Sequence, residues 1–254
     1  MNTHEQRHRG VYLNDKALFS GEQLLRLHDA VYELCWLLDH CYARHSAIQL
    51  VGDHHRLTIR QRLAISRAAC SSVNRELRQA KCLPIERIED QHLIIDGFNL
   101  IITVETAMAG GLLLHCCDGC IRDIASIHGT YRQVHETRQA IELIGNVLQS
   151  FTPESVLWLF DKPVSNSGRL AVMVRDIAEA HRWNWQAELI ENPDQAILDS
   201  HKAAITSDSA ILDGVGHWVN LGACLVTKYF HEAWLIDFSD ALSKPEESIQ
   251  RVDC

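Results

Sequence analysis

Apolar residues recur every three or four positions through the first third of the chain, which is the spacing of an amphipathic helix. Over residues 18–48 the pattern predicts one helix, which Ser20 and Gln23 would open as a capping box. Over residues 58–80 it predicts a second helix, with Thr58 as its N-cap. The first third of the chain is therefore expected to be helical.

Beyond residue 91 the pattern changes to short apolar runs separated by helical segments. Wholly apolar runs of this length are typical of strands buried on both faces of a sheet. Since strands that alternate with helices form right-handed crossovers, we expect an α/β fold with a mainly parallel sheet and helices on both faces. The predicted strands are residues 92–98, 155–160, 185–190 and 203–206, with 233–238 as a further edge strand. A long helical region of more than one helix is predicted at about residues 112–149, and single helices are predicted at 167–181 and 195–200.

The boundary between the two patterns is marked by Pro84 and by the charged run at residues 86–90, which is typical of a linker. We therefore predict a helical domain over residues 1–88, an α/β domain over residues 91–242 and a C-terminal tail over residues 243–254.

The balance of basic and acidic residues also differs between the two predicted domains. The protein has 254 residues and a formal net charge of −9, which argues against a simple basic nucleic-acid binder. Residues 1–90 carry 13 Lys/Arg and 11 Asp/Glu, whereas residues 91–254 carry 11 and 22. The two regions are therefore expected to have different partners.

Membrane, secretory and disulfide-rich classes are disfavoured. No apolar run is long enough to span a membrane, and the polar start of the chain does not resemble a signal peptide. Nine cysteines, an odd number in a long chain, indicate reduced thiols in a cytoplasm. The one Cys-x-x-Cys lacks a second pair to complete a zinc site. We expect Cys116, Cys117 and Cys120 to be small buried residues on a helix.

An aspartate follows each of the four best strand candidates. Carboxyl ends of parallel strands meet at one edge of a sheet, where open α/β sheets bind ligands. Carboxylates gathered there would repel one another without a cation, and their oxygens suit Mg²⁺ or Mn²⁺. For a single aspartate the alternative is a helix cap or a turn, but independent caps have no reason to follow every strand. The four residues are Asp96, Asp161, Asp194 and Asp208.

These four elements resemble, in order and spacing, those of NYN domains, a branch of the PIN-like nucleases. Residues 93–100, Leu-Ile-Ile-Asp-Gly-Phe-Asn-Leu, are similar to that family's first strand, and residues 157–161 to its second. Residues 192–197 match its Ala-Asp-x-x-Ile element, with proline in the alanine position, and residues 205–209 match its Thr-Ser-Asp signature. The resemblance covers about residues 91–215.

The resemblance implies a PIN-like (Rossmannoid) fold and a metal-dependent endonuclease, usually one that acts on RNA. PIN-like domains often pair, so the resemblance also admits a homodimer. It makes Asp96, Asp161, Asp194 and Asp208 the ligands of Mg²⁺ or Mn²⁺, with Asn99 and Ser207 as polar supports of the same site.

Two other function classes compete with the nuclease. A catalytically inactive PIN-like protein that binds nucleic acid or regulates would keep the fold and lose turnover. A phosphatase or phosphotransferase would use the same kind of sheet. Its nucleophilic aspartate usually stands in Asp-x-Asp, whereas Gly97 and Phe98 follow Asp96 here, so we rank it last.

The whole chain also resembles a prokaryotic protein family in which a helical DUF434 domain precedes a PIN-like domain called DUF5616. Residues 42–57 carry the first resemblance and residues 161–169 the second. This resemblance implies an architecture and no mechanism.

Two basic segments are candidate phosphate-binding surfaces. Ser165 and Ser167 precede a helix whose free N–H groups could receive a phosphate, with Lys162 and Arg169 beside them. The alternative is that Ser167 only caps this helix. The helix at 58–80 has a basic face that either contacts nucleic acid or is simply solvated. The arginines assigned to that contact are Arg56, Arg60, Arg62 and Arg67.

Overall fold

The computed structural model describes residues 8–125 and 131–241. The predicted tail at 243–254 and the polar start at residues 1–7 lie outside the described residues. In the part of the chain that is described, no helix combines the length and the apolar character that a bilayer crossing requires.

The first predicted helix is two helices. The chain forms α2 (Glu22–Asp39) and α3 (Arg44–His54), separated by a turn in which Cys41 has a φ of 60°. The predicted capping box is wrong, because Gly21 is the N-cap of α2 and the Ser20 hydroxyl donates to the carbonyl of Lys16. The turn folds α3 back against α2. Both helices have apolar residues at helical spacing, so the spacing alone could not show where one helix ends and the next begins.

The second predicted helix is also divided, into α4 (Ile59–Ala68) and α5 (Ser72–Lys81). The N-cap prediction is confirmed, since Thr58 and Gln61 form a capping box at the start of α4. Ala69 is extended, and the Ser71 hydroxyl accepts from an α5 N–H group to start the next helix. A short helix, α1 (Asp15–Leu18), precedes these four.

The chain from residue 82 onward forms the predicted, mainly parallel sheet. All pairs in this six-stranded sheet are parallel, in the order β1-β8-β7-β2-β5-β6. A 3₁₀ turn (Ile85–Ile88) follows its first edge strand. The strands are β1 (Cys82–Leu83), β2 (His92–Asp96), β5 (Ser155–Asp161), β6 (Trp185–Ile190), β7 (Ala203–Ile205) and β8 (Trp218–Val219).

Helices cover both faces of this sheet, as predicted. Within β2 the side chains alternate: Leu93 and Ile95 pack with one set of helices, and Ile94 packs with the other. Buried strands of this kind are therefore apolar at every position. One face carries α6 (Gly97–Met108), α7 (Thr137–Gln149), α8 (Ser167–His181) and α11 (Leu221–Tyr229), and the other carries α9 (Pro193–Asp199) and α10 (Ser209–Gly214).

The helical region predicted over 112–149 is wrong in its first part. Among the described residues of that range only α7 is helical, and residues 113–123 instead form an antiparallel hairpin of β3 (Leu113–His115) and β4 (Ile121–Asp123). The edge strand predicted near residue 235 is β9 (Leu235–Asp237), which pairs with β3. The three cysteines expected on a helix are buried as expected, but they lie in and beside the hairpin turn.

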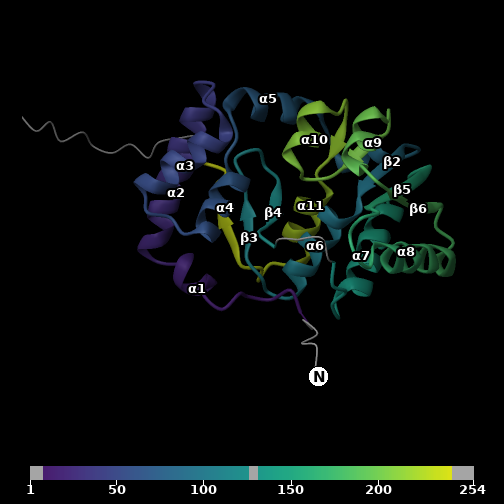
Figure 1. The fold of residues 1–254 in the computed structure, drawn as a ribbon. Coiled ribbons are helices and arrows are strands. Elements are labelled where there is room, and N and C mark those ends of the chain that lie inside the picture. The colour runs from purple at the N-terminus through teal and green to yellow at the C-terminus, as the bar shows by residue number, and fades with distance from the viewer. Residues whose placement is uncertain (1–7, 126–130, 242–254) are drawn as a thin grey trace, which may run out of the picture.

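This three-stranded sheet lies between the N-terminal helices and the α/β layers (Figure 1). Leu114 and Ile236 pack into one core with α2, α3 and α4. Leu113 and Ile121 point to the other side, where they meet Val226 of α11. The alternation of side chains in short strands thus joins the two halves of the molecule through a shared apolar layer.

A buried group of three charges closes the same junction. Asp118 in the hairpin turn accepts from Arg78 of α5 at 2.6 Å and from both terminal nitrogens of Arg122 at 2.8 and 2.6 Å. The side chains are 1%, 2% and 6% exposed, in that order. Burial alone would raise the pKa of Asp118, but the two arginines outweigh it and lower that pKa to about 2.

Replacing Asp118 should expose how much this junction contributes. Asp118→Asn leaves the buried Arg122 without a carboxylate partner and Arg78 with Asp213 alone, so we expect a loss of about 3–5 kcal/mol of unfolding free energy at pH 7. Because the folded pKa lies below the ordinary value of about 3.9, the contribution is present above pH 4 and disappears as the pH falls towards 2. Urea unfolding at pH 7 and pH 3 measures both effects.

The control is Asp176→Asn, which removes an exposed carboxylate on α8 and should change the unfolding free energy by less than about 0.5 kcal/mol. Equal stability of Asp118→Asn and the wild type at pH 7 would contradict the role given to this group.

Candidate active site

The four predicted aspartates stand at the carboxyl ends of neighbouring strands. Asp96 ends β2, and Asp161 ends β5, which pairs with β2. Asp208 follows β7 on the other side of β2. Asp194 lies in the first turn of α9, which follows β6 and packs against β2 and β5. The parallel topology therefore brings one carboxylate from each of four crossover units to one edge, as predicted.

The helix-cap alternative applies to one of the four. The Asp208 side chain accepts from the N–H groups of Ala210 and Ile211 at 2.8 and 3.2 Å, so it caps α10 through Oδ1. Asp96 precedes α6 without a side-chain cap, and Asn192 is the residue that caps α9 in front of Asp194. Capping therefore does not explain why these acids gather.

Gly97 is the residue that lets α6 start immediately behind Asp96. A Cβ atom at this position would lie 2.2 Å from a ring carbon of Phe160 on the neighbouring strand. The Asp-Gly pair of the motif thus has a packing reason: the backbone must pass close to the Phe160 ring.

Polar side chains fix the loops that carry these acids. The Thr206 hydroxyl donates to Asp96 Oδ2 at 3.0 Å and accepts from the Asp208 N–H at the same distance. Asn99 Oδ1 accepts from both the N–H and the hydroxyl of Ser207, at 2.8 and 2.9 Å. Asn99 and Ser207 were predicted as a supporting pair, whereas Thr206 was missed although it belongs to the Thr-Ser-Asp signature.

The carboxylates influence one another electrostatically. The pKa of Asp96 is raised to about 7, first by burial and then by the charges of Asp208 and Asp194, against the hydrogen bond from Thr206. The pKa of Asp194 is raised by burial and by Asp208 and Asp161, and burial raises that of Asp161. Asp194 is therefore within electrostatic reach of the other three.

Among the described residues, no basic side chain neutralises the four carboxylates at this edge of the sheet. None of the four carboxylates takes part in an ion pair with lysine, arginine or histidine there. Their spacing is loose, however. No three of them have oxygens that lie within 4.8 Å of one another. Among the described residues, one group of three side chains elsewhere in the molecule is that compact.

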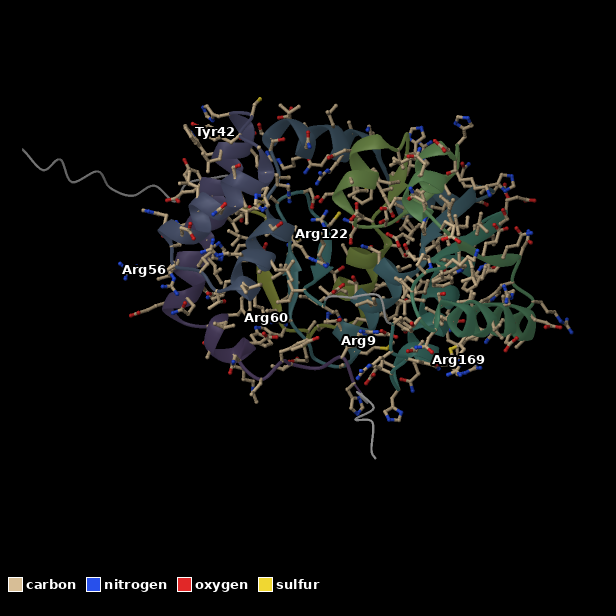
Figure 2. All side chains as sticks on the ribbon, viewed as in Figure 1. Arg9, Tyr42, Arg56, Arg60, Arg122 and Arg169 are labelled. Carbon is tan, nitrogen blue, oxygen red and sulfur yellow. The ribbon has the colours of Figure 1, made fainter. Side chains whose placement is uncertain are left out.

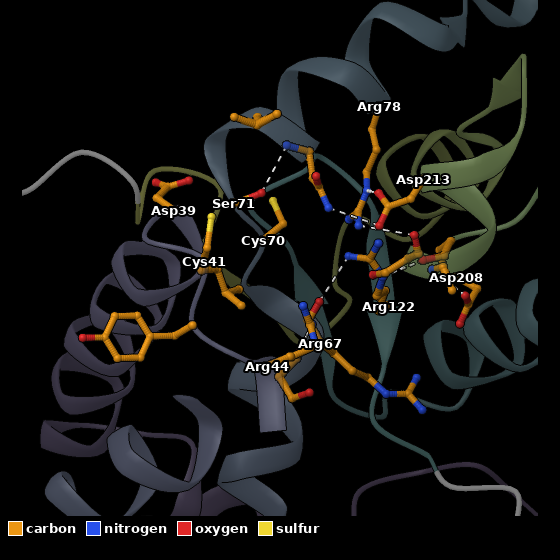
Figure 3. A pocket seen from close by; sticks show the side chains of 18 of the residues that line it. Asp39, Cys41, Arg44, Arg67, Cys70, Ser71, Arg78, Arg122, Asp208 and Asp213 are labelled. Atoms are coloured by element: carbon orange, nitrogen blue, oxygen red, sulfur yellow. Dashed lines mark hydrogen bonds and ion pairs between the residues drawn. The ribbon is translucent and has the colours of Figure 1, made fainter. Parts of the chain in front are cut away.

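A cavity of about 830 Å³ adjoins Asp208 (Figure 3). The N-terminal helices form one wall, and the loop from Ser207 to Ala210 forms part of the other. Arg122 also holds this loop directly, because its Nε donates to the carbonyl of Ser207 at 2.7 Å. The arginines that line the cavity are Arg44, Arg67, Arg78 and Arg122.

Arg44 differs from the other three arginines of the cavity. Arg78 and Arg122 share Asp118, and Arg67 lies 3.9 Å from the carboxylate of Asp123. Arg44 donates only to the carbonyls of residues 66 and 69 among the described residues. Burial, and then the charges of Arg78 and Arg122, lower its pKa, so its positive charge is the least compensated in the cavity.

The arginines predicted to bind nucleic acid do not present one surface. Arg60 pairs with the buried Asp15, and Arg62 pairs with Asp53 at 2.7 Å. Arg67 donates to the carbonyl of Asp123 at 2.9 Å and lines the cavity. Arg56 is exposed at the outer edge of the N-terminal helices (Figure 2). Their nucleic-acid contact stays a prediction, and the structure gives three of them partners inside the protein.

The predicted phosphate loop follows Asp161 directly. Lys162 pairs with the exposed Glu191 at 2.7 Å, while Ser165 and Arg169 are exposed. Ser167 does not cap α8, because it is the first helical residue and its hydroxyl faces the carbonyl of Lys162 at 3.5 Å. Arg169 lies far from Arg56, towards the opposite end of the molecule (Figure 2). Phosphate binding by this loop stays a prediction.

Two segments of the chain match models of known protein families. Residues 85–224 match the family described as "Domain of unknown function (DUF5616)", and residues 26–81 match "Protein of unknown function (DUF434)". The chain is 28% identical over 177 residues to the uncharacterized protein MJ0935 of Methanocaldococcus jannaschii, which covers 70% of this chain and 84% of that protein. No solved structure matches the chain.

Asp96→Asn should stabilise the metal-free protein at alkaline pH. The folded carboxyl pKa of about 7 lies above the unfolded value of about 3.9, so wild-type stability falls as the pH rises through that window. The amide does not ionise. We expect the variant to be more stable than the wild type by roughly 2–4 kcal/mol at pH 8 and to lose this advantage at pH 4.

Urea unfolding in the presence of a chelator measures this difference, with Asp176→Asn as the control for an exposed carboxylate. A stability difference that does not change between pH 4 and pH 8 would show that Asp96 ionises normally.

Proposed function

The chain belongs to the DUF5616 family, and we propose that the acidic edge of its sheet is the active site of a divalent-metal-dependent endonuclease that cuts RNA. The observation that carries the proposal is the placement of four carboxylates at the carboxyl ends of neighbouring strands, where none has an ion-pair partner among the described residues. Burial and two neighbouring carboxylates raise the pKa of Asp96 to about 7, and no basic side chain among the described residues relieves that repulsion. A divalent cation is the partner that such a group of acids lacks.

The donor set fits Mg²⁺ or Mn²⁺. All four candidate ligands are carboxylates, which hard cations prefer. The loose spacing agrees with Mg²⁺, which usually keeps several waters and contacts one or two carboxylates directly. Asp96 and Asp208 would be the direct ligands, and Asp161 and Asp194 would complete the site or orient the attacking water. Bound there, the ion would neutralise charge on a phosphoryl group during in-line attack.

The protein's own side chains would fix the geometry of this site. The Thr206 hydroxyl holds one oxygen of Asp96 and leaves the other oxygen for binding. Oδ1 of Asp208 caps α10, which fixes the side chain, and Oδ2 would be the atom that binds the ion. Asn99 and Ser207 keep the intervening loop in place. Such support by neighbouring groups is what a positioned catalytic site requires.

The cavity supplies a place for the rest of the substrate. It adjoins Asp208 and contains the uncompensated charge of Arg44, so a phosphate of the RNA backbone could bind there while the next one meets the acids. The PIN-like resemblance favours the same reaction, because its Asp-Gly-Phe-Asn and Thr-Ser-Asp elements lie at strand ends in this fold. Pairing into a homodimer is proposed from the resemblance alone.

One observation favours a second function. The acids are too far apart for three of them to contact one ion without rearrangement. A PIN-like protein that binds RNA and has lost turnover would tolerate this spacing, so binding without cleavage is the alternative to be tested.

Cleavage of labelled single-stranded RNA in Mn²⁺ distinguishes the two functions. We expect the wild type to cut, and the double variant Asp96→Asn/Asp208→Asn to cut at least 100-fold more slowly while still binding RNA, because the charge that holds the ion is gone. Single-stranded DNA of the same sequence tests the choice of substrate.

Asp199→Asn, on α9 but at its far end from Asp194, is the matched control and should keep wild-type activity. Binding without cleavage in any divalent ion would reject the enzyme, and equal cleavage by wild type and double variant would indicate a contaminant.

Arg44→Gln tests the contribution of the cavity. Its guanidinium has no carboxylate partner among the described residues, so its loss should weaken RNA binding about 10-fold and reduce the salt dependence of binding by roughly one phosphate contact. Fluorescence anisotropy at several salt concentrations measures both quantities. Arg138→Gln, which removes an exposed arginine on α7, is the control, and an equal effect of the two variants would exclude a specific role for Arg44.

A further inference from the structure

A group of three side chains outside the acidic edge has the spacing of a metal site. Glu33 of α2, His54 at the end of α3 and His55 directly after it each offer one ligand atom, and these atoms all lie within 4.8 Å of one another. His55 Nε2 and Glu33 Oε2 are 2.8 Å apart. The two imidazole rings lie edge to face, with centroids 4.8 Å apart. Within the described residues no other trio of histidine, cysteine or acidic side chains is this compact.

We propose that Glu33, His54 and His55 bind one Zn²⁺ ion. Two imidazoles and a carboxylate are the nitrogen and oxygen ligands that zinc accepts, whereas Mg²⁺ prefers oxygen alone. Ligand atoms about 2.1 Å from a tetrahedral zinc ion lie about 3.4 Å from one another. The trio reaches that arrangement if the Glu33–His55 contact opens by a fraction of an ångström and the more distant atoms approach.

The backbone corner that carries the two histidines is already fixed. Arg62 donates to the carbonyls of Leu57 and Gln49 and pairs with Asp53, so it links the residues on both sides of the corner. A Cβ atom at Gly52 would lie 2.5 Å from this guanidinium, which means that the helix closes tightly over Arg62. A site whose backbone is held before binding costs less entropy to assemble.

Three protein ligands leave a fourth position of zinc open. Glu33 and His54 also line an apolar hollow of about 490 Å³ between α2 and α3. Trp36 and Leu50 are 48% and 57% exposed at its rim. Structural zinc sites are closed by four protein ligands, whereas sites that exchange a ligand keep one position free. The open position therefore takes a water or a small ligand from this side.

The plain alternative is a hydrogen bond between His55 and Glu33 that only ties α3 to α2. The two readings differ in one measurable respect, because a hydrogen bond needs no metal. Glu33→Gln preserves a hydrogen-bonding partner for His55 and removes the anionic ligand. His54→Asn removes a ligand from an exposed position that the hydrogen bond does not use.

The test is a zinc titration of the full chain after removal of metal by a chelator, by calorimetry and by equilibrium dialysis with metal analysis. We expect one tightly bound zinc per chain in the wild type, and affinity at least 10-fold lower in His54→Asn and in Glu33→Gln. His45→Asn, an exposed histidine at the other end of α3, is the matched control and should bind as the wild type does.

Two further readouts exclude other sites and unfolding. Cobalt in place of zinc should give a tetrahedral visible spectrum without a sulfur-to-cobalt band, which separates this site from the free cysteines. The double variant Asp96→Asn/Asp208→Asn should bind zinc as the wild type does, which would show that the zinc is not bound at the acidic edge. The zinc proposal can therefore fail without affecting the nuclease proposal, and the reverse also holds. Zinc at about one hundred times Kd should raise the wild-type Tm by roughly 5 °C.

Unchanged melting of metal-free His54→Asn would show that this variant still folds. Zinc binding by His54→Asn and Glu33→Gln with wild-type affinity, or no binding by the wild type, would overturn the proposal.

Discussion

The buried carboxylate of Asp118 is the constraint on which the arrangement of the molecule depends. It joins Arg78 from the N-terminal helices to Arg122 of the hairpin, and Arg122 in turn holds the carbonyl of Ser207. One isolated charge in this position would be costly to bury, so Asp118 and Arg122 depend on each other, and Arg78 joins them with Asp213 as its second partner. The loop that carries Asp208 therefore keeps its place because the N-terminal helices are docked.

The acidic edge could be predicted from the sequence because a strand-end residue is fixed by local pattern. The apolar runs predicted the bounds of β2, β5, β6 and β7 to within a few residues. Because parallel strands end at the same edge of a sheet, the residues that follow them were expected to lie together. The roles of Asn99 and Ser207 as a pair followed from the motif. What the pattern could not supply was the spacing of the carboxylates, which depends on how α9 and α10 pack against the sheet.

The hairpin and the cavity could not be predicted. The apolar residues of the hairpin face two different cores, Leu114 on one side and Leu113 and Ile121 on the other, so the segment lacks the alternation that marks a strand with one face in water. The partners of Arg78 lie 40 and 135 residues away along the chain. The sequence therefore predicts that the basic residues of the helix at 58–80 lie on an exposed surface. In the structure Arg60 and Arg62 instead pair with acids of other helices, and Arg67 donates to the hairpin.

The more basic first third of the chain and the more acidic remainder meet at the cavity. Its walls combine Arg44, Arg67 and Arg78 from the more basic first third with the loop after β7 that carries Asp208. Neither part alone would suit a nucleic-acid strand, because the acids repel phosphate and the arginines have no metal to offer. In the proposed nuclease the two parts would have separate tasks: the positive charge would attract one phosphate, and the adjacent carboxylates would hold the cation that acts on the next one. The docking of two differently charged regions, and not the net charge of −9, is therefore the electrostatic property that bears on function.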